Sequence, residues 1–122
     1  MNPVAGAHAL AGTVLLLAPG RVLSVLEGRR PGRAGLLVAR VLGARHAGQA
    51  LVLAAHPDLA GWGAAVDALH GASMAAWAGG ARPRRRAATA SALVAALLAL
   101  AEAAQKYSSA RVDPGRCRSM PW

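Results

Sequence analysis

This chain contains four apolar stretches separated by clusters of charged residues or proline, over residues 4–18, 34–55, 59–80 and 87–104. A helix needs about 20 apolar residues to cross a hydrocarbon core of ~30 Å. The last three stretches have about this length, whereas the first is shorter and covers only about 22 Å as a helix. We therefore predict an all-α, four-helix transmembrane bundle. Its short first helix is expected to be followed by an interfacial segment over residues 21–27, because Pro19 ends or kinks the first helix.

Length and composition limit the alternatives. A chain of 122 residues allows one domain, and a hydrophobic content of 55% excludes intrinsic disorder as the main state. One cysteine cannot form an internal disulfide. We expect a single membrane domain over residues 1–105 and a polar, disordered C-terminal tail over residues 106–122. A soluble helical bundle is the minor alternative.

The formal net charge of +9 comes mostly from arginines that flank the apolar stretches. Such arginines orient membrane helices and contact anionic lipid headgroups, and no nucleic-acid reader motif accompanies them, so we expect no nucleic-acid partner. The positive-inside rule places the first and third loops in the cytoplasm, so both termini of this multi-pass plasma-membrane protein are expected outside; the basic tail opposes this orientation. The expected topology and headgroup residues are Arg29, Arg30, Arg33, Arg82, Arg84, Arg85 and Arg86.

Polar residues inside the second and third stretches are the most informative feature of the sequence. A charge at membrane depth costs at least ~2.5 kcal/mol on insertion scales and normally has a partner. Arg45 would lie about 18 Å from the cytoplasmic side, and Asp67 would lie at the same depth on the adjacent antiparallel helix. We predict an ion pair between them near mid-membrane. The expected intramembrane polar cluster consists of Arg45, His46, Gln49, Asp67, His70 and Ser73.

Three interpretations of this cluster remain open. It fixes the register of the helices as a structural clamp, or it forms a ligand or proton site in which Asp67 and the histidines titrate. The third interpretation is a metal or haem site that pairs His8 with His46, because both would lie roughly 20 Å from the cytoplasmic face. Our prediction is that the protein has no cofactor and no metal. Glu102 and Lys106 are expected to form an exposed pair four residues apart on the last helix.

Small residues recur at four-residue spacing in the last three stretches. Such faces let helix backbones approach closely, which drives helix association in lipid. The stripes are Gly35, Ala39, Gly43 and Ala47; Ala60, Ala64, Ala68, Ala72 and Ala76; and Ala87, Ser91, Ala95, Ala99 and Ala103.

The sequence contains no catalytic motif, so we expect a protein that is not an enzyme. The expected function is association through its helices, as a homo-oligomer or as an accessory subunit of a larger membrane protein complex, with membrane lipids as further partners. The alternative is a carrier or sensor of a small ligand, a lipid or a proton that uses the central cluster of Arg45, His46, Asp67 and His70.

Three short motifs resemble those of small uncharacterised actinobacterial integral membrane proteins of about four helices. They are Pro19-Gly20-Arg21-Val22-Leu23, Leu42-Gly43-Ala44-Arg45-His46 and Val66-Asp67-Ala68-Leu69-His70 with Ser73-Met74, and the resemblance covers residues 3–104. It implies that Arg45, His46, Asp67 and His70 are characteristic polar positions of the family. The family has no assigned activity, so the resemblance implies no reaction.

Overall fold

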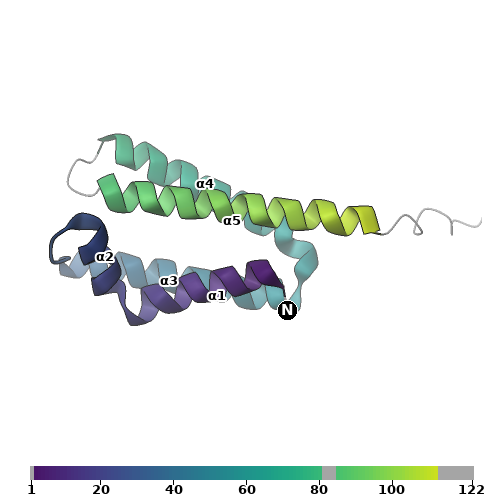
Figure 1. Ribbon diagram of the computed structural model, residues 1–122, viewed down its shortest axis with the longest axis horizontal. Helices are drawn as coiled ribbons and strands as arrows, with labels where there is room; N and C mark the ends of the chain where they lie inside the picture. Colours follow the sequence, from purple (N-terminus) through teal and green to yellow (C-terminus); the bar gives the residue numbers. More distant parts are fainter. Residues whose placement is uncertain (1, 81–84, 113–122) are drawn as a thin grey trace, which may run out of the picture.

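The computed structural model describes residues 2–80 and 85–112, and this part of the chain is helical without any strand (Figure 1). The prediction of an all-α fold is confirmed. The described residues form five α-helices instead of four, because the expected interfacial segment is a separate helix after a sharp bend. The elements are α1 (Pro3–Leu17), α2 (Pro19–Glu27), α3 (Arg33–Ala55), the 3-10 turn η1 (Pro57–Leu59), α4 (Ala60–Gly80) and α5 (Arg85–Val112).

Residues with known capping chemistry set the limits of the first two helices. The Asn2 side chain accepts hydrogen bonds from the backbone N–H groups of Val4 and Ala5, and Pro3 occupies the first helical position. Pro19 begins α2, which is bent by 90° from α1. Gly28 ends α2 with φ of 68°, a left-handed conformation that glycine adopts without a steric penalty.

The long helices pair into two layers. α1 packs on α3, α4 packs on α5, and Figure 1 shows the two pairs lying one above the other. α2 contacts both α3 and α5 and lies at the end of the molecule where α5 begins. A small apolar cluster of Val4, Ala5, Leu53 and Ala60 joins the layers near the opposite end.

The predicted small-residue stripes differ in how far they are buried against another helix. Gly43 and Ala39 of α3 are buried, and a Cβ at Gly43 would lie only 3.0 Å from the Gly12 carbonyl oxygen of α1. Ala95 of α5 is buried as well. On α4, by contrast, Ala68, Ala72 and Ala76 are exposed, because α4 packs on α5 through a neighbouring face that contains Gly71 and Ala78.

Two described helices are long and apolar enough to cross a membrane: α3 and residues Arg85–Ser109 of α5. The bent pair of α1 and α2 makes a third if it is one broken span. The expectation of four spans is therefore met in part. α4 has 21 residues but does not reach the mean hydropathy of α3 and α5, because Val66 and Leu69 are its only large aliphatic side chains and it contains Asp67 and His70. Large apolar side chains are exposed along the helices, as expected for contact with lipid, including Leu10, Leu37, Leu51, Leu69, Leu97 and Leu100.

The expected boundary of a disordered tail at residue 106 is wrong for residues 106–112. α5 continues through them to Val112, because this segment contains neither proline nor glycine. The hydroxyl groups of Ser108 and Ser109 donate to the carbonyl oxygens four residues earlier, at 3.0 Å each. Residues 113–122, and Arg82 and Arg84 of the expected topology set, lie outside the described residues.

Candidate functional site

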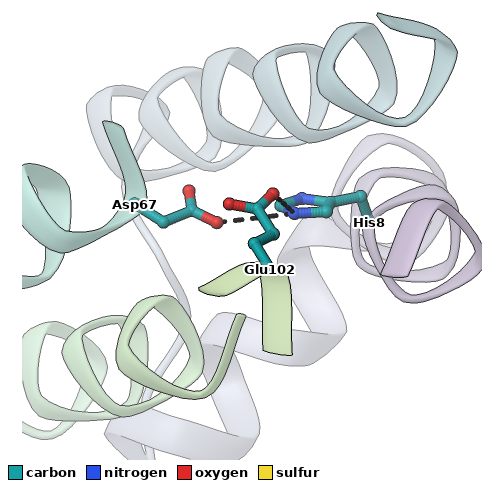
Figure 2. A group of neighbouring side chains, drawn as sticks. All are labelled: His8, Asp67 and Glu102. Atoms are coloured by element: carbon teal, nitrogen blue, oxygen red, sulfur yellow. Dashed lines mark hydrogen bonds and ion pairs between the residues drawn. The ribbon is translucent and has the colours of Figure 1, made fainter. Parts of the chain in front are cut away.

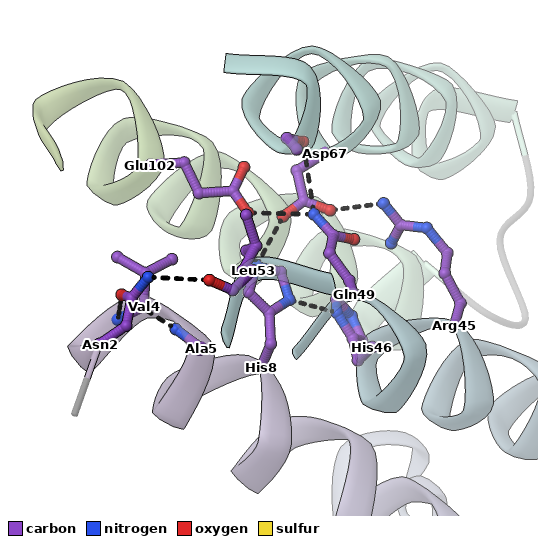
Figure 3. A network of polar contacts seen from close by, with 11 residues as sticks. Asn2, Val4, Ala5, His8, Arg45, His46, Gln49, Leu53, Asp67 and Glu102 are labelled. Carbon is purple, nitrogen blue, oxygen red and sulfur yellow. Dashed lines mark hydrogen bonds and ion pairs between the residues drawn. The ribbon is translucent and has the colours of Figure 1, made fainter. Parts of the chain in front are cut away.

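Six polar side chains from all four long helices meet between the two layers (Figure 3). We call them the polar cluster. His8, Asp67 and Glu102 are completely buried, and His46 is 3% exposed. The cluster consists of His8 from α1, Arg45, His46 and Gln49 from α3, Asp67 from α4 and Glu102 from α5.

A close crossing of α1 and α3 brings the two histidines together. A Cβ at Gly12 would lie 2.7 Å from the backbone nitrogen of Ala47, so only glycine allows the backbones to approach this closely. His8 lies one turn before Gly12, and His46 lies three residues after Gly43. Their Nδ1 atoms are 3.0 Å apart and share a hydrogen bond. Two ligands on opposite sides of one iron would be about 4 Å apart at metal–nitrogen distances of ~2.0 Å, so this arrangement does not bracket a haem iron.

The predicted ion pair between Arg45 and Asp67 is confirmed. The Arg45 Nη2 donates to Oδ1 of Asp67, and both residues belong to the expected cluster. The Arg45 side chain is 26% exposed, whereas that of Asp67 is fully buried. The other oxygen of Asp67, Oδ2, lies 3.4 Å from His8 Nε2, which is an ion-pair distance without hydrogen-bond geometry.

The expectation that Glu102 is exposed and paired with Lys106 is wrong. Glu102 is fully buried, and its Oε1 accepts from Gln49 Nε2 at 3.0 Å and lies 2.8 Å from His8 Nε2. Gly63 of α4 makes room for it, because a Cβ there would lie 2.6 Å from this oxygen. The Lys106 side chain instead lies against Gly61, which, like Gly63, belongs to α4.

Two expected members of the cluster lie elsewhere. His70 contacts Ser91 of α5 through Nε2 at 3.1 Å, and the exposed Ser73 donates to the Leu69 carbonyl oxygen at 2.8 Å. Sequence reasoning left His8 and Glu102 out of the expected set. A signal for His8 was its shared depth with His46, and one for Glu102 was that it is the only acidic residue of the last apolar segment.

A cavity of about 390 Å³ opens between the layers beside the polar cluster. All five α-helices contribute to its walls, and α2 covers it with Val22, Leu23 and Leu26. The walls are mostly apolar, and the polar groups in the interior are His46, His70 and Ser91. At the edge formed by α2, Glu27 and Arg29 form an ion pair at 3.3 Å. This size and lining are typical of a site for a small molecule.

Several buried polar atoms of the cluster have no hydrogen-bond partner among the described residues. They include Oδ2 of Asp67, Oε2 of Glu102 and Nη1 of Arg45. The ligand atoms of His8, Asp67 and Glu102 all lie within 4.8 Å of one another and point to a common centre (Figure 2). An imidazole and two carboxylates are a donor set that suits a metal ion, and leaving such groups unpaired in the interior is costly.

The chain matches no protein-family model, no curated protein and no solved structure. Its class is defined by its own fold and site: over the residues that the structure describes, it is a helical protein with two or three candidate membrane-spanning helices and a buried cluster of ionisable side chains.

Proposed function

We propose that this protein is an integral membrane protein that binds a small amphipathic molecule in the cavity between its two helical layers. In this arrangement α1, α3, α4 and α5 all cross the bilayer, and α2 lies in the interface on the side of the arginines. α4 crosses although it is less apolar, because Asp67 faces the protein interior, where intramembrane charges normally lie. The main observation that supports the proposal is the cavity of about 390 Å³.

The lining of the cavity defines the chemistry of the proposed ligand. Leucine, valine and alanine side chains surround most of the volume and fit an apolar body. At the inner end, the imidazoles of His46 and His70 can donate to or accept from a ligand, and His70 is positioned by Ser91. We therefore expect a lipid-soluble molecule with one hydroxyl or carbonyl group at one end of an apolar skeleton.

Native mass spectrometry of the full chain, purified from its own membranes in mild detergent, tests this proposal. The wild type is expected to retain one small molecule, which tandem fragmentation identifies. Ala90→Trp places an indole in the cavity and should remove the bound mass, whereas Ala101→Trp on the exposed side of the same helix should not. Wild-type protein without a bound molecule, or retention by A90W equal to that of A101W, contradicts the proposal.

Self-association is a second candidate function, and the exposed small-residue stripe of α4 favours it. Ala68, Ala72 and Ala76 are exposed at four-residue spacing, and Ala68 and Ala72 line a groove beside α5. A second copy presenting the same stripe allows close backbone contact. The wild type should then cross-link as a dimer in mild detergent, and Ala72→Leu should abolish the dimer while Ala101→Leu preserves it.

A further inference from the structure

We propose that His8, Asp67 and Glu102 bind one divalent first-row transition-metal ion, such as Mn²⁺ or Zn²⁺, at the centre of the polar cluster. The three side chains come from α1, α4 and α5, so the ion would join the two helical layers (Figure 2). This site is separate from the amphipathic ligand of the cavity. Neither Asp67 nor Glu102 lines that cavity.

The distances between donor atoms fit one ion. His8 Nε2 lies 2.8 Å from Oε1 of Glu102 and 3.4 Å from Oδ2 of Asp67. Two ligands that are each about 2.0–2.1 Å from one metal are separated by about 2.8–3.4 Å in octahedral or tetrahedral geometry. Both separations from His8 therefore match this range, and all three donor atoms lie within 4.8 Å of one another.

Each donor side chain also contacts a second residue outside the group of three. His8 Nδ1 contacts His46, Oδ1 of Asp67 accepts from Arg45, and Oε1 of Glu102 accepts from Gln49. Metal-binding histidines commonly use the second ring nitrogen in this way, and binding carboxylates are commonly hydrogen-bonded. Oδ2 of Asp67, which faces His8, is buried without a hydrogen-bond partner among the described residues, and so is Oε2 of Glu102, so this carboxylate can bind the ion through Oε1, as the distances above assume, or through both oxygens.

Charge supports the same assignment. Two completely buried carboxylates lie close together, and Arg45, the one arginine paired with either of them in the described part of the chain, pairs with Asp67. A divalent cation between the carboxylates offsets the cost of burying two like charges. The three donor side chains offer nitrogen and oxygen atoms but no sulfur. This set suits Mn²⁺, Fe²⁺ or Zn²⁺ and disfavours Cu⁺.

Isothermal titration of the full-length, metal-stripped protein with MnCl₂ and ZnCl₂ in mild detergent tests the site. One saturable ion per chain is expected for at least one of the two metals. Glu102→Gln should weaken that binding at least ~10-fold, and Gln49→Leu, which removes an outer partner, about 10–100-fold. His56→Ala and Cys117→Ser are the controls for other donors and should leave the affinity unchanged.

X-ray absorption spectroscopy of the metal-loaded wild type identifies the ligand atoms directly. It therefore tests the site even if the variants do not fold. One imidazole with oxygen donors supports the site, and sulfur or two or more imidazoles overturns it. Absence of saturable binding of either ion to folded wild type, or a folded E102Q that binds like wild type, also overturns it. The cavity variant A90W should bind the ion normally, so failure of the ligand proposal and failure of the metal proposal give different results.

Discussion

Asp67 is fully buried, and its two carboxylate oxygens face different helices. Oδ1 accepts from Arg45 of α3, whereas Oδ2 faces His8 of α1. An ionised carboxylate in such a position depends on its partners, because desolvation is not offset by water. The residue therefore links α4 to both helices of the other layer.

Replacing Arg45 with Met should destabilise the protein by on the order of 3 kcal/mol, because Asp67 would stay buried without its cation. The free energy of unfolding in mixed detergent micelles measures the effect. Arg40→Met on the same helix is the control, since Arg40 is exposed and the change should be small. The double variant R45M/D67L should recover most of the loss, because it removes both charges; no recovery would contradict the ion-pair account.

Gly63→Ala should destabilise the protein by about 1–3 kcal/mol, which is the usual cost of overpacking a tight site. The new Cβ would lie 2.6–2.8 Å from the Glu102 carboxylate, which is buried and held by His8 and Gln49. Gly79→Ala on the same helix has nothing within 4 Å and should be neutral or slightly stabilising. Equal unfolding free energies for the two variants would show that Glu102 can move aside freely.

The sequence predicts the partner of a residue well when the partner depends on depth along the helix. It predicts the partner poorly when this depends on how the helix is rotated about its own axis. Arg45 and Asp67 were predictable, because counting residues from the helix ends places them at one depth. Glu102 was not, because a pair four residues apart has the same spacing whether it is exposed or buried. Its burial follows from the rotation of α5 against α4, which the packing of Ala95 and Gly71 fixes.

The crossing of α1 and α3 brings two helix backbones into close contact. Gly12 and Gly43 let the backbones touch, and this contact sets the distance between His8 and His46. At the level of elements the sequence predicts well, because the apolar stretches correspond closely to α1, α3, α4 and most of α5. The separate α2 and the extension of α5 to Val112 show that charge marks the end of an apolar stretch, and not always the end of a helix.

Gly43→Ala should separate α1 from α3 and lower the midpoint of thermal unfolding. Its Cβ would lie 2.9–3.0 Å from Leu15 Cβ, the Gly12 carbonyl oxygen and the Leu16 nitrogen, and the last two are backbone atoms that cannot rotate away. Gly48→Ala on the same helix meets nothing within 4 Å and is the matched control. We expect a loss of about 1–3 kcal/mol for G43A only. Equal unfolding midpoints would mean that the crossing is not a strict packing constraint.

At the scale of the whole molecule, one end is rich in arginine. Arg29, Arg30 and Arg33 lie in or beside the connection from α2 to α3, and Arg85 and Arg86 begin α5 at the same end (Figure 1). The opposite end holds η1, which contains Asp58 and no basic residue, and the last turns of α5, which contain Lys106 and Arg111, so the described arginine-rich end has the larger positive charge. This asymmetry supports the orientation proposed from the positive-inside rule.

Cysteine labelling in intact cells tests that orientation. In a Cys117→Ser background, His56→Cys should react with a membrane-impermeant maleimide from outside, because His56 adjoins η1. Arg30→Cys should react only after the membrane is permeabilised. The reverse pattern would place the arginine-rich end outside and contradict the proposed topology.

The polar cluster also constrains how the protein is made. His8 and its partner Glu102 are 94 positions apart, so α1, α3 and α4 are synthesised before this contact can form. In the proposed topology, until α5 has inserted, His8 and Gln49 lie inside the membrane without the Glu102 carboxylate, and their remaining contacts are to His46, Asp67 and the Gly63 carbonyl oxygen. Completion of the last helix supplies this carboxylate. A chain interrupted before Glu102 thus lacks the contact that joins α1 and α3 to the last helix, and a finished chain contains it.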